Sequence, residues 1–405
     1  MNGTVMQVGT GRRQGRHRQP VGIAVALMAL LSALVLGYAQ EASASGGDAP
    51  ALTSGEGAAF AMTNVTTDNR IISYRRTADG RLTATGSIST RGHGSGTDLD
   101  TQGALQLSKD HRYLYAPNAG SDDISVFSVN GTRLRFLQRI DAGDQPNSLT
   151  LHENLLYVLN GSVAGNGIRG FRVAGDGTLT LMEGSFRALS SPIAVPGQVA
   201  FSPNGRLLLV TQKTTAVTLS PQIAIDAFQL RGDGYPMATP TRNASHGVRP
   251  FSLAFRGNDE LVVTESFDAA PKRSALSSYR VSPTGDLSTV SGSVRNEQTD
   301  MCWVVVTKDG RYAYTANFGS GTISSYGYGP AGRLRLLDGD AATTGYQSQP
   351  VDLALSQDGR YLYLLLRGTG GVAAFKVFDG GGLKPLGVVT DGLFANYGAS
   401  GLVVY

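Results

Sequence analysis

The stretch Thr307–Tyr326, TKDGRYAYTANFGSGTISSY, decides the fold of this protein. Lys308-Asp309-Gly310 has the composition of a tight turn, because Asp and Gly accept the backbone conformations that hairpin turns need. The next residues, up to Asn317, are rich in Tyr and Thr, as expected for a strand. Gly319-Ser320-Gly321 supplies a second turn, and Thr322–Tyr326 is the next predicted strand.

The same pattern recurs along the chain. Each repeat begins with an apolar strand, followed by a turn, two further strands and a fourth that opens after a Gly-x-Leu or similar turn. Successive first strands end 44 to 54 residues apart, at Leu107, Leu151, Phe201, Phe255, Val306 and Leu355. Four strands in each repeat of about 50 residues are typical of a β-propeller blade.

The two ends of the chain supply one further blade. Residues 58–90 contain three predicted strands, and residues 401–405, GLVVY, contain one more. Together they form a seventh blade from strands of both termini, which leaves no exposed edge between the first and last blades. We therefore predict an all-β fold, a seven-bladed β-propeller over residues 58–405 whose ring is closed by the N- and C-terminal strands.

The N-terminus has the pattern of a signal peptide over residues 1–44. A basic region, Arg12–Arg18, precedes an apolar run, Val21–Gly37, and Ala42-Ser43-Ala44 offers a cleavage site. An uncleaved membrane anchor is the alternative. Residues 45–57 are rich in Ala, Gly and Ser and are predicted to form a flexible linker. This pattern predicts a secreted, periplasmic or extracellular protein with no membrane attachment after cleavage.

Composition excludes several classes of protein. The formal charge of +4 falls to about +1 once the four N-terminal arginines and Glu41 are removed, so nucleic-acid binding is not expected. Cys302 is the sole cysteine, which rules out an internal disulfide, and its apolar context predicts a buried thiol. No metal or dinucleotide motif occurs in a suitable context, so no metal or cofactor is expected. A closed ring is expected to be a monomer.

The strand endings YVLN and YTAN, with turns such as TKDGR and SQDGR, resemble the secreted branch of the lactonase family of propellers, which has 6-phosphogluconolactonase-like and carboxymuconate-cyclase-like members. The resemblance covers nearly the whole mature chain. The family pattern has Pro-Arg-His before one first strand and Asn-Glu-Leu after the second. Here these positions hold Pro250-Phe251-Ser252 and Thr264-Glu265-Ser266, so the Glu is retained while the Arg and His are absent.

Propeller geometry indicates where a site would lie. The start of each first strand and the end of each antiparallel second strand meet at one mouth of the central channel. Glu265 and Asp352 are carboxylates at such positions, and we expect catalytic roles for them, a solvated channel wall being the alternative. The residues expected to bind substrate are Trp303, Gln198, Gln212, Ser252, Arg249 and His246. Trp303 could instead be a core residue, and His246 an exposed loop residue.

Two functions follow from these observations. The resemblance implies a hydrolase that opens a lactone or similar cyclic ester at the channel mouth, or a related cyclase or isomerase, with Glu265 as the base. The absent Arg and His favour the alternative, a non-catalytic propeller outside the cytoplasm that binds a carbohydrate, peptide or partner protein. Whether the protein is an enzyme is left open by the sequence. In either case a small lactone or sugar-like molecule is a candidate ligand.

Overall fold

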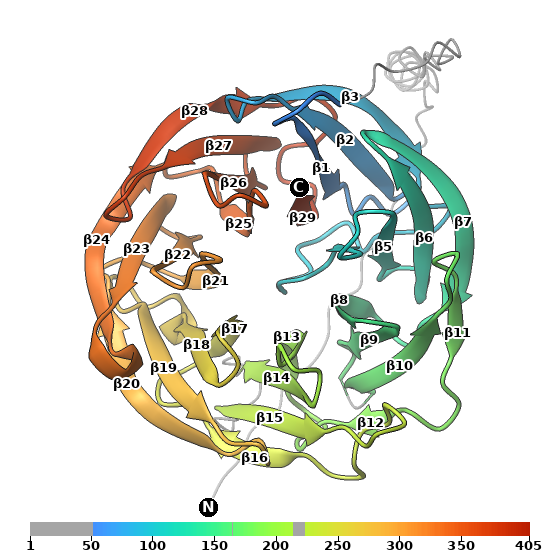
Figure 1. Ribbon diagram of the computed structural model, residues 1–405, viewed down its shortest axis with the longest axis horizontal. Coiled ribbons are helices and arrows are strands. Elements are labelled where there is room, and N and C mark those ends of the chain that lie inside the picture. Colours follow the sequence, from blue (N-terminus) through green and yellow to red (C-terminus); the bar gives the residue numbers. More distant parts are fainter. Residues whose placement is uncertain (1–51, 164, 214–222) are drawn as a thin grey trace, which may run out of the picture. The chain divides into compact units, whose positions relative to one another are not determined.

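A computed structural model describes residues 52–163, 165–213 and 223–405. Its four-layered ring of strands is a seven-bladed β-propeller, as predicted (Figure 1). The expected signal peptide (1–44) and residues 45–51 of the expected linker lie outside the described residues. At the start of the described chain, Glu56 forms an ion pair of 2.6 Å with Arg75, and the first strand begins at Gly57.

Each blade is an antiparallel sheet. Its strands lie side by side, with the first next to the channel and the last at the circumference. The innermost strands of blades 1 to 7 are β29 (Ser400–Val404), β4 (Gln106–Leu107), β8 (Pro146–His152), β13 (Val195–Phe201), β17 (Pro250–Arg256), β21 (Met301–Val306) and β25 (Pro350–Leu355). The second strands, in the same order, are β1 (Gly57–Met62), β5 (Tyr113–Asn118), β9 (Leu155–Asn160), β14 (Leu207–Lys213), β18 (Glu260–Glu265), β22 (Tyr312–Asn317) and β26 (Tyr361–Leu366).

The outer half of each blade is more exposed, and its strands follow the same order. The third strands are β2 (Arg70–Arg76), β6 (Asp123–Asn130), β10 (Gly167–Val173), β15 (Ala224–Gln229), β19 (Ala275–Val281), β23 (Thr322–Tyr328) and β27 (Gly371–Val377). The outermost strands are β3 (Leu82–Ser89), β7 (Arg133–Asp141), β11 (Leu179–Leu181), β16 (Thr241–Ala244), β20 (Leu287–Arg295), β24 (Leu334–Thr343) and β28 (Leu383–Val389). Blade 3 also has β12 (Arg187–Ala188), and short 3-10 helices cover Phe267–Ala269 and Pro330–Gly332.

The two termini close the ring in blade 1. Strand β29 pairs with β1 in an antiparallel register that places Val403 opposite Phe60. The last residue is also held, because Tyr405 N donates to Ala58 O (3.0 Å) and Arg76 Nε donates to Tyr405 O (3.0 Å). The predicted closure by strands from both ends of the chain is confirmed.

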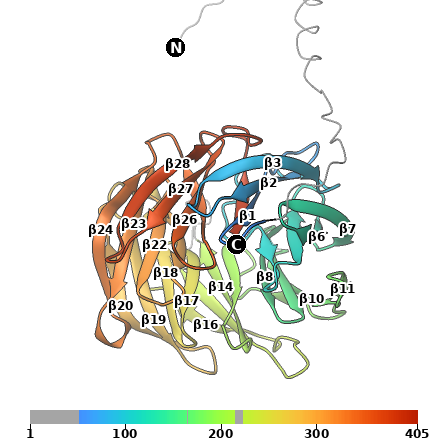
Figure 2. The same ribbon diagram turned by 45° about the horizontal axis from the view of Figure 1, so that its top comes forward.

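The core lies between neighbouring blades, whose strands Figure 2 shows in an oblique view. The two faces of the inner strands of each blade pack against the two neighbouring blades. Val262 of blade 5, for example, is buried in the same cluster as Val304 of blade 6. Buried tyrosines add hydrogen bonds across these interfaces. Tyr115 Oη donates to Gly177 O of the next blade (3.1 Å), and Tyr157 Oη donates to Gly234 O (2.8 Å). Both glycines have positive φ, which the tight turn requires.

The long connection between β3 and β4, residues 90–105, enters the central channel (Figure 1). We call it the central loop. Its Gln102 side chain bonds both backbone groups of Val304, accepting from the N–H (2.9 Å) and donating to the carbonyl (3.0 Å). Ser148 Oγ of blade 3 donates to Gln102 O (2.6 Å). The central loop is therefore tied to innermost strands on both sides of the channel.

Within the described residues, neither short helix is long or apolar enough to span a membrane.

Candidate functional site

One mouth of the channel carries a cluster of charged side chains, which we call the charged mouth: Asp98, Asp100, Lys213, Arg249, Asp300 and Arg367. Blades 4 to 7 supply one residue each, either just before an innermost strand or at the end of a second strand. The central loop supplies the two remaining aspartates. Arg249 and Asp300 have φ angles of 56° and 57°, a left-handed conformation that non-glycine residues adopt infrequently.

Asp100 joins two cations from adjacent blades. Its Oδ2 lies 2.6 Å from Lys213 Nζ and 3.3 Å from Arg249 Nη2. The Lys213 side chain is fully buried, and its Nζ lies 4.4 Å from the centre of the Phe251 ring. A buried ammonium needs such partners, because an unpaired charge loses its hydration without compensation. Asp100 itself is 36% exposed, so solvent reaches this part of the mouth.

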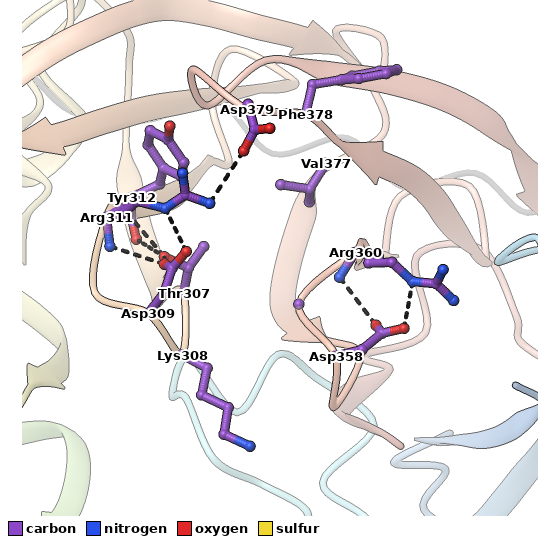
Figure 3. A pocket seen from close by; sticks show the side chains of 11 residues that line it. Thr307, Lys308, Asp309, Arg311, Tyr312, Asp358, Arg360, Val377, Phe378 and Asp379 are labelled. Atoms are coloured by element: carbon purple, nitrogen blue, oxygen red, sulfur yellow. Dashed lines mark hydrogen bonds and ion pairs between the residues drawn. The ribbon is translucent and has the colours of Figure 1, made fainter.

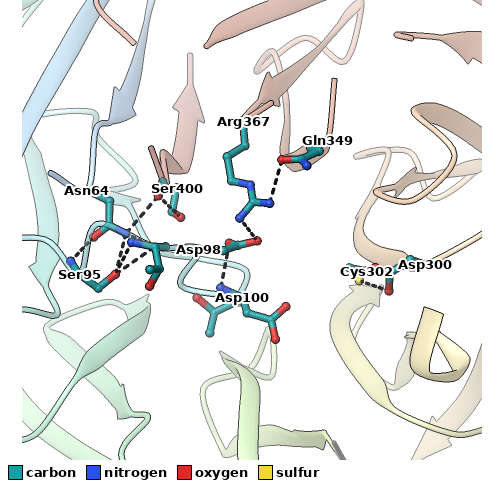
Figure 4. A network of polar contacts seen from close by, with 12 residues as sticks. Asn64, Ser95, Asp98, Asp100, Asp300, Cys302, Gln349, Arg367 and Ser400 are labelled. Carbon is teal, nitrogen blue, oxygen red and sulfur yellow. Dashed lines mark hydrogen bonds and ion pairs between the residues drawn. The ribbon is translucent and has the colours of Figure 1, made fainter. Parts of the chain in front are cut away.

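Asp98 makes a separate pair with Arg367 of blade 7 (3.0 Å). Figure 4 shows the Arg367 guanidinium between Asp98 and Gln349, to whose Oε1 it donates a hydrogen bond of 2.8 Å. The same guanidinium lies over the Phe318 ring, 4.8 Å from its centre. Burial raises the pKa of Asp98, and Arg367 offsets this only in part.

Asp300 differs from the other aspartates of the charged mouth. Among the described residues it has no ion-pair partner, and its side chain accepts one weak hydrogen bond, from Cys302 Sγ (3.4 Å; Figure 4). Burial raises the pKa of Asp300, although nearby Arg249 acts in the opposite direction. Burial also raises the pKa of the Cys302 thiol, so the thiol stays protonated and can donate to Asp300.

Arg249 faces these carboxylates with unused hydrogen-bonding capacity. Its Nε is buried and has no hydrogen-bond partner among the described residues. Burial alone would lower the pKa of Arg249, but Asp100 and Asp300 raise it. A carboxylate with a raised pKa beside a guanidinium with a free donor is an arrangement suited to proton transfer next to a developing negative charge.

Asp352 and Trp303 lie beneath the central loop. Asp352 is 4% exposed, and its Oδ2 accepts a hydrogen bond from Gly401 N (2.7 Å). Burial raises the pKa of Asp352 to about 7. Trp303 is 1% exposed, packs against Phe251 and donates from Nε1 to Thr101 O (2.9 Å). Both side chains are therefore covered by the central loop instead of lining an open channel.

Gln198 connects two neighbouring blades, whereas Ser252 is bonded within blade 5. Gln198 Oε1 accepts a hydrogen bond from Leu253 N (2.8 Å), which joins blade 4 to blade 5. Ser252 N donates to Thr264 Oγ1 (2.9 Å), and the buried Ser252 hydroxyl has no partner among the described residues. Neither side chain belongs to the charged mouth.

Glu265, Gln212 and His246 form hydrogen bonds with loops and outer strands of their own blades. Glu265 is fully buried and accepts hydrogen bonds from Gly247 N (2.8 Å), Ser277 Oγ (2.5 Å) and Ser293 Oγ (2.6 Å). His246 is exposed, and its Nδ1 lies 2.9 Å from Ser293 Oγ. Gln212 Nε2 donates to Ser190 Oγ (2.8 Å). Of the residues singled out in the sequence, Arg249 is the one that the structure brings into the charged mouth. The roles expected for the others stay predictions.

Sequence reasoning missed five members of the charged mouth: Asp98, Asp100, Lys213, Asp300 and Arg367. One signal could have identified the two loop aspartates. Connections without strands are rarely as long as residues 90–105, and long ones often carry function. The acidic pair Asp98 and Asp100 lies inside that connection.

Other hollows lie between the turns that join first and second strands. One of them, between blades 6 and 7, is drawn in Figure 3. Its arginines and aspartates pair locally, since Arg311 pairs with Asp309 (2.5 Å) and Asp379 (3.2 Å), while Arg360 pairs with Asp358 (2.6 Å). These exposed pairs belong to the repeating turns and contribute little energy. The charged mouth is the stronger candidate site because its groups are buried and converge from several blades.

Metal binding is not indicated in the described part of the chain. No group of three or more His, Cys, Asp or Glu residues there is arranged to hold a metal ion.

Comparisons with known proteins agree with this architecture. Residues 56–195 and 223–350 match the family model described as lactonase, 7-bladed beta-propeller. An inferred 6-phosphogluconolactonase from Bacteroides uniformis has a similar structure, with a TM-score of 0.66 and 17% identity over 87% of this chain and 100% of that chain. A periplasmic gluconolactonase from Pseudomonas aeruginosa gives a TM-score of 0.60 and 18% identity over 86% of this chain and 99% of that chain. No curated protein matches the sequence.

Proposed function

Because the chain belongs to the lactonase family of seven-bladed β-propellers, we propose that it hydrolyses a lactone or similar cyclic ester at the charged mouth. One observation carries this proposal. Asp300, which has a raised pKa and no ion-pair partner among the described residues, is near enough to Arg249 for the guanidinium to influence its pKa, and the Arg249 Nε donor is unused there. Such a base near such a cation can promote ester hydrolysis.

Each group has one role in the proposed reaction. The Asp300 carboxylate removes a proton from water, and the water oxygen attacks the lactone carbonyl carbon. The carbonyl electrons move to its oxygen, where the Arg249 guanidinium stabilises the negative charge. Collapse of this intermediate breaks the ring C–O bond. Asp300 then returns its proton to the leaving alkoxide, and the product is a hydroxy acid. The reaction consumes one water molecule and needs no oxidant or reductant.

Lys213 and Asp100 support this pair. Asp100 is bound by Lys213 and Arg249 together, so it holds the two cations close to each other across two blades. The family's Arg and His positions are occupied here by Phe251 and Ser252. In the proposed site, Arg249 supplies the positive charge from two residues earlier in the chain.

The proposed enzyme acts outside the cytoplasm as a monomer on a small-molecule substrate. Support for export comes from the signal-peptide pattern of residues 1–44. The N-terminal sequence of the protein recovered from a secreting host tests this point. A mature terminus near Ala44 is expected, and an intact N-terminus on a membrane-bound protein would contradict it.

The activity is tested with purified protein and a panel of lactones that includes D-glucono-1,5-lactone. Proton release is measured at constant pH and compared with the uncatalysed rate. We expect acceleration for at least one member of the panel, removed in an Asp300→Asn variant. If the protein leaves every lactone at its uncatalysed rate, the proposed function is wrong.

A further inference from the structure

In six blades, a residue within two positions of the end of the second strand has a shared task. Its side chain forms a hydrogen bond with the loop that precedes the innermost strand of the same blade. The pairs are Asn64 with Gly398 O (3.1 Å), Asn118 with Thr90 Oγ1 (2.7 Å), Asn160 with Asp144 O (3.0 Å), Gln212 with Ser190 Oγ (2.8 Å), Glu265 with Gly247 N (2.8 Å) and Asn317 with Asn296 Nδ2 (2.9 Å). This residue therefore sets the conformation of the loop at the mouth.

Blade 5 performs this task with a carboxylate. Glu265 receives three donors, from Gly247, Ser277 and Ser293, so both of its oxygens are occupied. Gly247 approaches so closely that a Cβ at this position would lie 2.1 Å from Glu265 Oε2. Glu265 therefore bonds the loop of blade 5 through Gly247 N, while Ser277 of β19 and Ser293 of β20 fix its carboxylate.

The loop held in this way carries Arg249, two residues after Gly247. Arg249 has a φ of 56°, which a non-glycine residue adopts only with support from its surroundings. Two backbone bonds support the end of the loop: Ser266 N donates to Arg249 O, and Phe267 N donates to Val248 O (both 3.2 Å). Glu265 supplies the support on the other side of the turn.

We propose that Glu265 is a positioning residue, which fixes residues 245–249 and thereby holds the Arg249 guanidinium at the charged mouth. This inference rests on the proposed function and assigns Glu265 a role through Arg249 instead of contact with substrate. Its carboxylate is fully buried and saturated with protein donors, so it does not reach a water or lactone in the mouth.

A double-mutant cycle with Glu265→Gln and Arg249→Ala separates positioning from base catalysis, with kcat/KM for D-glucono-1,5-lactone as the readout. Glu265→Gln alone is expected to lower kcat/KM by about 10- to 100-fold, since misplacement by 1 Å can have such an effect. In the Arg249→Ala background it is expected to change kcat/KM by less than about 2-fold. A loss of about 10²- to 10⁴-fold in both backgrounds would instead identify Glu265 as a general base and overturn the inference.

Amide hydrogen exchange gives a second readout that does not depend on activity. Glu265→Gln is expected to speed exchange at residues 246–249, whereas Arg249→Ala is not. Asn160→Ala is the matched control, because it removes the equivalent contact in blade 3 and should speed exchange near residues 142–147 alone. Ser293→Ala, which removes one of the three donors, replaces Glu265→Gln if the latter does not fold.

The outcomes distinguish the two proposals. Unchanged exchange at residues 246–249 in the Glu265 variant would overturn the positioning role whatever the activity. Faster exchange there, combined with full activity of Arg249→Ala, would preserve the control of the loop by Glu265 but reject both the proposed hydrolysis at Arg249 and the inference that builds on it.

Discussion

Asp300, Arg249 and Lys213 obtain their properties from neighbours that are remote in sequence. Asp300 has a raised pKa because burial removes water from its carboxylate. The fully buried Lys213 has an ion-pair partner because Asp100 reaches it from the central loop. The contacts of Asp100 with Lys213 and Arg249 do not follow from the local sequence, since they join the central loop to blades 4 and 5. The blade-by-blade pattern locates such residues near the mouth but does not say which of them meet.

Glu265 shows both the strength and the limit of reasoning from repeats. It replaces an amide in an otherwise repetitive position, and this difference directed attention to blade 5. The sequence could not indicate that Gly247, Ser277 and Ser293 would enclose its carboxylate. The orientation of a side chain at a strand end depends on loops whose conformations the repeat pattern does not specify.

Asp352 is expected to make stability depend on pH. Its pKa is raised from 3.8 to about 7 in the folded state, so the folded protein binds a proton that the unfolded chain has released. Stability conferred by the protonated form is present below pH 3.8 and is lost as the pH rises to about 7. The loss amounts to at most about 4 kcal/mol, since one pKa unit corresponds to about 1.4 kcal/mol.

Asp352→Asn tests this expectation, because an amide keeps the shape and an acceptor for Gly401 N. Urea denaturation of both proteins between pH 4 and pH 8 should show the wild type losing stability relative to the variant as the pH rises. A difference between the two proteins that does not change with pH would show that Asp352 is ionised in the folded state throughout this range.

At the level of elements, the central loop is the least predictable part of the fold. The strands follow from the repeat, and their observed bounds confirm predicted ends such as Leu107, Phe201 and Val306. The path of residues 90–105 across the channel depends on contacts with blades 3, 4 and 6, more than 200 residues away in the case of Val304. Its length was visible in the sequence, but its destination was not.

Gln102→Ala should destabilise the protein by about 2–4 kcal/mol, because the N–H and carbonyl of Val304 lose their partners on an innermost strand. Chemical denaturation measures this change. Lys109→Ala, at an exposed turn, is the control and should alter stability by less than about 0.5 kcal/mol. Equal stability of the Gln102 variant and the control would mean that the central loop does not bind the channel wall as described.

At the scale of the whole molecule, the ring depends on the strand contributed by the C-terminus. Strand β29 is the innermost strand of blade 1 and contacts β25 of blade 7 as well as β1. Its Leu402 is buried in the same core cluster as Tyr363. Seven blades could be predicted from the sequence because six complete repeats left three strands at one end and one at the other.

Deletion of residues 400–405 should abolish the single cooperative unfolding transition, since blade 1 would lose its innermost strand and the ring its closure. Differential scanning calorimetry provides the measurement. Tyr405→Phe is the control: it removes only the hydrogen bond to Gly131 O (2.9 Å) and should keep one transition at a slightly lower temperature. A truncated chain that melts like the wild type would show that β29 is not needed to close the propeller.

The rate of lactone hydrolysis by the wild type and by Asp300→Asn, measured on the same substrate as a function of pH, tests the account most directly. We predict that the wild-type rate rises with pH through a pKa above the usual range of an aspartate, as the raised pKa of Asp300 requires. The variant should lose about 10²- to 10⁴-fold in kcat with an unchanged melting temperature. A variant that is folded and as active as the wild type would contradict the assignment of Asp300 as the base.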